Sequence, residues 1–282
     1  AAGEVTYKAS PSAAGTSSFS VTATDAAGNQ TSQDVTLTVT LPPATTVSGL
    51  AFNADTGTAS NDLVTKTAAQ TVSATLSAAL SNGQTLQASL DNGSTWTDVS
   101  SFVSGTALSW TSVNLTASNT LKLEVRDSAG NAGTALSQAY VLDTSAAAPT
   151  LALATDSGGS NSDSLTNVGT VNVTDLEADA TWEYSTNGGT NWAAGTSTGT
   201  GTGSFILAQA SYAAGAVQVR QTDKAGNTST AGSIAAAITV DSTGAVFSSG
   251  ATATTPINTA TSVVVYDANA TDGGGAADAG IT

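Results

Sequence analysis

Apolar and polar residues alternate along much of the chain, in segments such as SFSVTAT, DVTLTVT, TLKLEVR and AVQVRQT. Alternation with a period of two residues places the apolar side chains on one face of a β-strand and the polar ones on the other. A long apolar period of 3.6 residues, which would favour helices, does not compete with this pattern. Short strands with Gly, Asn and Asp between them predict an all-β fold, built of tandem antiparallel β-sandwiches in an elongated array.

The phrase Asp-x-Ala-Gly-Asn occurs three times, beginning at Asp25, Asp127 and Asp223. Successive copies are 102 and 96 residues apart, which is the size of a small all-β domain. Each copy lies between two alternating segments. The phrase is therefore predicted to form the same hairpin turn in each copy of a repeated fold.

Two further motifs recur and set the domain boundaries. An Asn-Gly turn precedes a tryptophan in both SLDNGSTW and YSTNGGTNW, and a pair of aspartates seven residues apart occurs in both ADTGTASND and TDSGGSNSD. The predicted segments are the closing strands of one domain (residues 1–42), a first repeat (43–142), a second repeat (143–241) and the opening strands of another domain (242–282).

Composition excludes several classes of function. The 282 residues include no Cys, Met or His, so the usual zinc, copper and iron sites and nucleophile–histidine catalysis are not expected, and we predict no enzyme. Asp and Glu number 21 against 6 Lys and Arg, a net charge of −15. This balance argues against nucleic acid and anionic membranes as partners but suits calcium, and no apolar run is long enough for membrane insertion of this segment.

The two repeats resemble the immunoglobulin-like modules of giant bacterial surface adhesins, in which Asp-x-Ala-Gly-Asn recurs with a linker aspartate followed by Thr or Ser, here Asp143 and Asp241. The tail VVVYDANATDGGGAADAGIT resembles the opening strands of cadherin-like domains, and the head GEVTYKASPSAAGTSSFSVTATDAAGN resembles the closing half of such a domain. The resemblance implies an extracellular location at the bacterial cell surface. It also implies calcium ions at domain junctions, where they stiffen a long chain.

A sandwich of this type brings its B–C and F–G turns to the end that faces the preceding domain. The F–G turn of the second repeat would then face the linker aspartate, and its acidic B–C turn, TDLEADAT, would lie beside them. Crowded carboxylates repel one another unless a hard cation lies between them, and calcium accepts six to eight oxygen ligands. The ligands predicted at this junction are Asp143, Asp175, Glu177, Asp179, Asp223 and, from the preceding repeat, Asp62.

Further ligands are predicted at the other junctions, namely Asp163 and Asp241 after the second repeat, Asp272 in the tail and Asp127 at the first junction. The first junction departs from the pattern, because its linker LPPATT and its B–C turn SAALSNG carry no acid. Two prolines in that linker could stiffen it instead. Asp, Gly and Asn are also the residues that a tight turn favours, so each copy of the phrase can be explained as a turn alone.

These features predict a mechanical spacer in a large adhesin that serves cell adhesion and biofilm formation. Its partners would be neighbouring repeats of the same protein. One alternative is a subunit of an extracellular fibre or surface layer, in which the split end segments pair head to tail with other copies. Another is a glycan-binding module, which requires exposed aromatic rings; we expect Trp96, Trp110, Trp182 and Trp192 to fill cores instead. The Gly- and Thr-rich segment 196–203 is predicted to be a flexible connection.

Overall fold

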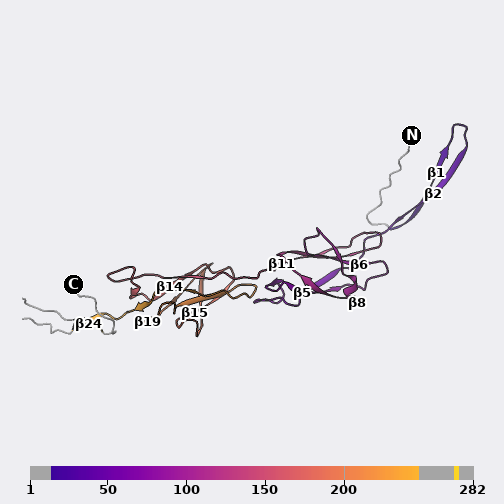
Figure 1. The fold of residues 1–282 in the computed structure, drawn as a ribbon. Coiled ribbons are helices and arrows are strands. Elements are labelled where there is room, and N and C mark those ends of the chain that lie inside the picture. The colour runs from indigo at the N-terminus through magenta and orange to yellow at the C-terminus, as the bar shows by residue number, and fades with distance from the viewer. Residues whose placement is uncertain (1–13, 200, 248–269, 273–282) are drawn as a thin grey trace, which may run out of the picture. The chain divides into compact units, whose positions relative to one another are not determined.

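A computed structural model describes residues 14–199, 201–247 and 270–272. The chain divides into two compact units, residues 1–144 (unit 1) and 145–282 (unit 2) (Figure 1). The described residues form β-strands in several mainly antiparallel sheets, and their single helical element is one 3-10 turn, η1 (Ser100–Phe102). The predicted all-β fold class is therefore confirmed.

Unit 1 begins with a two-stranded antiparallel hairpin of β1 (Gly15–Thr24) and β2 (Gln30–Val39). Phe19 pairs with Val35, and the alternation puts Phe19, Val21 and Val35 on the same face. These three side chains are 39%, 45% and 38% exposed. The hairpin thus carries an apolar face that the described part of the structure leaves open.

The rest of unit 1 is a sandwich of two sheets. All pairs of neighbouring strands are antiparallel except β4 and β11, which pair in parallel over two residues. The first sheet has the order β3 (Val47–Phe52), β5 (Ala69–Leu76), β9 (Ala107–Asn114) and β8 (Val103–Ser104). The second has the order β4 (Val64–Thr65), β11 (Leu136–Leu142), β10 (Asn119–Arg126), β6 (Thr85–Ser89) and β7 (Thr97–Asp98).

The core of unit 1 follows from the alternating pattern. On β10, Leu121, Leu123 and Val125 all face inward and are fully buried. Each such side chain contributes about 1.5–3 kcal/mol by leaving water. The ring of Phe52 meets the ring of Tyr140 edge to face, with centroids 5.9 Å apart. Aliphatic side chains therefore supply most of this core.

Unit 2 repeats the arrangement, but its second layer is split into two sheets. The first layer has the order β12 (Thr150–Leu153), β14 (Thr170–Thr174), β18 (Thr202–Ile206) and β17 (Thr196–Gly199). The second layer comprises β16 (Ala193–Ala194), β15 (Thr181–Ser185), β20 (Gln218–Thr222) and β21 (Gly232–Ser233), and separately β13 (Leu165–Thr166), β22 (Ile238–Val240) and β19 (Ala210–Tyr212). Beyond the sandwich, β23 (Ala245–Phe247) pairs with β24 (Ala270–Asp272).

The prediction for the Gly- and Thr-rich segment was wrong. Residues 196–199 and 202–206 form β17 and β18, an antiparallel pair within the first layer. A Cβ atom on Gly195 or Gly203 would overlap the ring of Trp182, which is 3% exposed. Glycine is used here because it leaves room for a buried indole, and not because the chain must be flexible.

Two other tryptophans lie half-buried at the surface, each beneath an arginine. The guanidinium carbon of Arg126 is 5.1 Å from the ring centroid of Trp96, and that of Arg220 is 4.2 Å from that of Trp192. A cation over an aromatic face is stabilised by the ring quadrupole. Arginine therefore covers one face of each of these two rings.

Candidate metal centre

The three Asp-x-Ala-Gly-Asn phrases form the same hairpin turn, as predicted. The carboxylates of Asp25, Asp127 and Asp223 each accept hydrogen bonds from the backbone N–H and the side-chain amide of the asparagine four residues later, at 2.7–2.9 Å. The glycine of each phrase has φ between 85° and 89°, a region that side chains strain to adopt. Aspartate therefore has a structural role in each of the three turns.

The turn itself stabilises the ionised carboxylate. In the first two copies, the hydrogen bond from the asparagine side chain lowers the pKa of Asp25 and of Asp127 below the ordinary value of 3.8. The third copy differs in burial, because Asp223 is only 3% exposed. A buried carboxylate loses hydration and depends more strongly on its neighbours.

Three of the predicted ligands lie together. One carboxylate oxygen each from Asp143, Glu177 and Asp223 lies within 4.8 Å of the other two. Asp143 directly follows β11, two residues before Ser145 begins unit 2; Glu177 lies in the connection between β14 and β15; and Asp223 directly follows β20. The fold thus brings together three acidic residues that are far apart in the sequence.

Local geometry directs Glu177 to this place. The connection between β14 and β15 reverses through Asp175 and Asp179, both of which have φ of 62°, in the left-handed region. The backbone N–H of Ala147 donates to Oε1 of Glu177 at 2.7 Å. The backbone N–H of Glu177 donates to Oε1 of Gln221 at 2.7 Å. Both the side chain and the backbone of Glu177 are therefore held within unit 2.

Sequence reasoning missed Gln221. This side chain is fully buried on β20, and its Nε2 donates to the carbonyl oxygens of Ala147 at 2.8 Å and Asp175 at 3.2 Å. The signal that could have found it is the amide at an inward-facing position in AVQVRQT, where the matching segment TLKLEVR has Val125.

The other predicted ligands have other surroundings. Asp175 and Asp179 have exposed side chains, and Oδ2 of Asp175 accepts a hydrogen bond from the Thr174 hydroxyl at 3.3 Å. Oδ1 of Asp62 accepts from the backbone N–H of Val64, and Oδ1 of Asp163 from that of Leu165, both at 3.1 Å. These two aspartates shape equivalent loops in the two units.

The last two candidates lie near the end of the chain. Oδ1 of Asp241 accepts from the backbone N–H of Thr243 at 3.0 Å. The backbone of Asp272 belongs to β24, opposite Ala245; its side chain lies outside what the structure describes.

The loops that hold Asp62 and Asp163 share one more feature. Oδ2 of Asp55 accepts from the N–H of Leu63, and Oδ2 of Asp156 from that of Ser164, both at 3.0 Å. The Oδ1 atom of each aspartate is buried and has no hydrogen-bond partner among the described residues. Such atoms are uncommon in folded proteins because a buried polar atom without a partner is costly.

The carboxylates of Asp143, Glu177 and Asp223 carry like charge when they are ionised, and like charges this close repel one another unless a cation lies between them. The donors of this cluster are all carboxylate oxygens, which suit calcium or magnesium rather than zinc or copper. Oxygens that already accept one hydrogen bond keep a second lone pair for a cation. The residues therefore fit a hard divalent ion.

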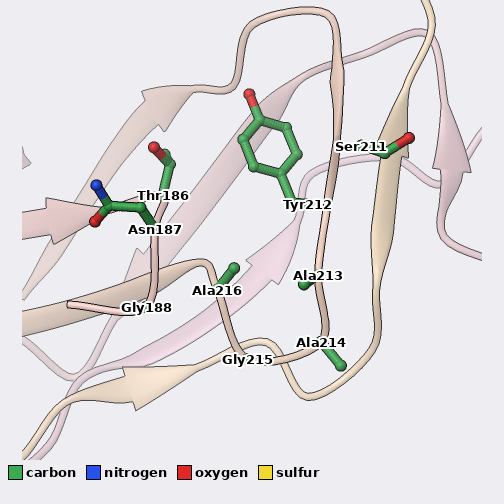
Figure 2. A pocket seen from close by; sticks show the side chains of 9 residues that line it. All are labelled: Thr186, Asn187, Gly188, Ser211, Tyr212, Ala213, Ala214, Gly215 and Ala216. Carbon is green, nitrogen blue, oxygen red and sulfur yellow. The ribbon is translucent and has the colours of Figure 1, made fainter. Parts of the chain in front are cut away.

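A separate pocket in unit 2 has a volume of about 460 Å³ (Figure 2). Small residues and the ring of Tyr212 line it, and the Tyr212 hydroxyl donates to the carbonyl of Ala208 at 2.9 Å. None of its nine lining residues is an acid, a lysine, an arginine or a histidine. The pocket therefore offers no carboxylate or imidazole for acid–base catalysis. Its lining comprises Thr186, Asn187, Gly188, Ser211, Tyr212, Ala213, Ala214, Gly215 and Ala216.

No family model and no curated protein matches the chain. It is similar in fold to a tetra-tandem repeat from the extending region of a large adhesion protein (18% identity, TM-score 0.32, covering 83% of this chain and 58% of that one). It is also similar to a Ca²⁺-stabilised adhesin that helps an Antarctic bacterium reach out and bind ice (24%, 0.31, 82% and 59%), and to the BSP domain of a biofilm-associated protein (18%, 0.23, 69% and 29%).

The chain spans less than two thirds of the length of each of these structures. Among the described residues, no helix is long and apolar enough to cross a membrane.

Proposed function

We propose that the chain is a spacer segment of an extracellular adhesin at the bacterial cell surface, in which calcium at Asp143, Glu177 and Asp223 restrains the linker. The observation that carries this proposal is the convergence of three carboxylate oxygens within 4.8 Å of one another. A turn preference explains Asp223 alone. It explains neither the aspartate of the linker nor the glutamate of a second turn.

Strand order supports an immunoglobulin-like assignment for both sandwiches. In unit 1, the order β3-β5-β9-β8 corresponds to strands A, B, E and D, and the partner sheet contains C, F and G as β6, β10 and β11. In unit 2, Tyr212 lies before β20 and bonds back to Ala208, as the tyrosine corner of such folds does. The cadherin-like nature of the end segments remains part of the proposal.

The linker aspartate is suited to transmit a restraint. Its backbone N–H donates to the carbonyl of Thr65 at 2.9 Å, which fixes the end of β11 in unit 1. A cation shared by the Asp143 side chain and the two turn carboxylates would limit rotation of the following linker. Since the ion binds the folded chain, it would add about 2.7 kcal/mol of stability at a free concentration 100 times Kd.

Calorimetry of the intact chain tests this proposal. The melting temperature of unit 2 is expected to rise when millimolar calcium replaces a chelator, with a smaller response to magnesium, which prefers a smaller octahedral site. Hydrogen exchange resolved by peptide would assign the change to the linker and to the two turns. A melting profile that is the same in calcium and in chelator would overturn the proposal.

A second candidate function rests on the open apolar face of the β1–β2 hairpin. A sheet face carrying Phe19, Val21 and Val35 is normally covered. The fibre-subunit alternative would cover it with the strands of residues 242–282 of a second copy, a head-to-tail contact that does not close on itself. Sedimentation over a concentration series should then show chains of copies, which Phe19→Ser should shorten. A species that stays monomeric at all concentrations would reject this alternative and leave the spacer proposal standing.

A further inference from the structure

Gln221 is a polar residue at a core position of unit 2. It lies on β20 two residues after Val219, which itself lies two residues after Val217, and all three side chains are at most 1% exposed. The matching strand of unit 1, β10, has only aliphatic residues at these positions and ends with Val125. An amide in such a place costs free energy unless its hydrogen bonds are satisfied, so its partners explain why it is tolerated.

The amide of Gln221 connects the two segments that flank the candidate metal centre. Its Oε1 accepts from the N–H of Glu177, and its Nε2 donates to the carbonyls of Ala147 and Asp175. The N–H of Ala147 in turn donates to the Glu177 carboxylate. Gln221, Ala147 and Glu177 therefore form a closed set of hydrogen bonds.

This set includes one cluster ligand, Glu177, and the segment that directly follows another, Asp143. Gln221 also lies on β20 two residues before the third ligand, Asp223, which directly follows that strand. The amide is neutral, so it can hold these segments without adding charge. A carboxylate at the same place would increase the repulsion.

We propose that Gln221 is a positioning residue that holds the carboxylates of the candidate calcium site together before the ion binds. The proposal rests on the calcium-binding function proposed above. Without such a clamp, mutual repulsion would let the carboxylates separate, and calcium would have to reassemble the site against that loss of order. Unit 1 is consistent with this role. It has Val125 in place of Gln221, and SAALSNG, which corresponds to the turn of Glu177, contains no acidic residue that would need to be held.

The decisive variant is Gln221→Met in the intact chain, with Val125→Met in unit 1 as the matched control. Methionine keeps the length of the side chain but cannot form these hydrogen bonds. Residues that orient metal ligands typically change affinity by about 10–100-fold when they are replaced. Isothermal titration calorimetry should therefore show a calcium Kd at least about tenfold higher for Gln221→Met and an unchanged Kd for Val125→Met.

A measurement on the wild type covers the case in which the variant fails to fold. The N–H of Glu177 donates to the Gln221 side chain, so hydrogen exchange of this amide reports the clamp directly. In chelator, it should exchange more slowly than an unprotected amide. Exchange at the unprotected rate would overturn the proposal, because the clamp would then not exist before calcium binds.

The two proposals fail in different ways. Wild-type calcium binding that Gln221→Met leaves unchanged would overturn the positioning role alone. Absence of calcium binding by the wild type would overturn the proposed function and the positioning role with it. A higher Kd for Gln221→Met, together with slow exchange of the Glu177 amide in calcium-free wild type, would support both.

Discussion

The turn after β10 in unit 1 and the turn after β20 in unit 2 have the same sequence pattern and nearly the same hydrogen bonds. In both, aspartate accepts from the backbone and the side chain of an asparagine four residues later. Their surroundings differ, because Asp127 is half-buried whereas Asp223 is buried beside two other carboxylates.

The residue that follows the preceding strand accounts for part of the difference. After β2 this residue is Thr40, whose hydroxyl oxygen accepts a hydrogen bond from the side chain of Asn131 at 2.7 Å. After β11 it is Asp143, a member of the acidic cluster. The turn of unit 1 is thus contacted by a neutral hydroxyl group, whereas three carboxylates lie together at the turn of unit 2. The repeated phrase forms the turn in both units. The carboxylates that lie beside the turn decide whether it can hold a metal ion.

The largest expected effect distinguishes the two turn aspartates. Asp127→Ala and Asp223→Ala each remove the bonds that close a turn, so both variants should be less stable than wild type in chelator. In saturating calcium, Asp223→Ala should lose a further contribution of about 2.7 kcal/mol at 100 times Kd, whereas Asp127→Ala should not. Calorimetry of both variants with and without calcium checks this. Equal losses under both conditions would show that the aspartates are turn residues only.

The second prediction concerns the linker. Asp143→Asn keeps the size of the side chain but removes one of the three charges, so the calcium Kd should rise at least about tenfold, equivalent to about 1.4 kcal/mol. The variant also removes repulsion within the cluster, so its stability should change less in chelator than in calcium. Titration calorimetry measures the Kd, and Thr40→Ala serves as a control outside the cluster. An Asp143→Asn variant with wild-type affinity would remove the linker from the site.

Local sequence signals predicted much of this molecule. The alternation of apolar and polar residues located the strands, since the side-chain period of a strand is two. The phrase Asp-x-Ala-Gly-Asn located three hairpin turns, because the hydrogen bonds between its aspartate and its asparagine lie within five residues. The same reasoning named Asp143, Glu177 and Asp223, which the fold brings together. It relied on the turns of a sandwich returning to one end, a property of topology rather than of side-chain detail.

The sequence did not predict features that depend on side-chain orientation in irregular segments or on contacts between distant residues. Asp175 and Asp179 flank Glu177 in the sequence, yet left-handed backbone at both positions accompanies exposed side chains, and only Glu177 joins the cluster. Gln221 looked like one more polar residue, because its role depends on contacts with residues 44 to 74 positions earlier in the chain. The glycines of segment 196–203 suggested flexibility, since nothing local shows that an indole fills the space beside Gly203.

A smaller effect is expected from giving unit 1 the linker residue of unit 2. Thr40→Asp removes the hydroxyl that Asn131 contacts and places a second carboxylate near the turn of Asp127. Repulsion between the two carboxylates should lower the stability of unit 1 in chelator. Millimolar calcium should recover part of this loss, since two carboxylates without a third acid form only a weak site. Melting of unit 1 under both conditions measures it, and a loss that calcium leaves unchanged would contradict this view of the first turn.

The smallest expected effect compares two further turns, those after β6 and β15. In unit 1, the hydroxyl of Thr95 donates to Asp91 at 2.6 Å, with further bonds from the Thr95 N–H and the Ser89 hydroxyl, and these lower the pKa of Asp91 to about 2. In unit 2, the neutral Asn187 takes this place, and its Oδ1 accepts from Asn191 at 2.9 Å.

Because the pKa of Asp91 is lower in the folded state than its ordinary value of 3.8, its contribution to stability is present above about pH 4 and is lost as the pH falls through about 2. Asp91→Asn should therefore lower the stability of unit 1 at neutral pH, and the stabilities of variant and wild type should converge as the pH falls from about 4 to about 2. Unit 2 should respond in the same way in both proteins. Hydrogen exchange resolved by peptide, measured from pH 5 downward, follows the two units separately. An acid response of unit 1 that is identical in wild type and variant would show that the Asp91 carboxylate contributes no more than the neutral amide at this turn.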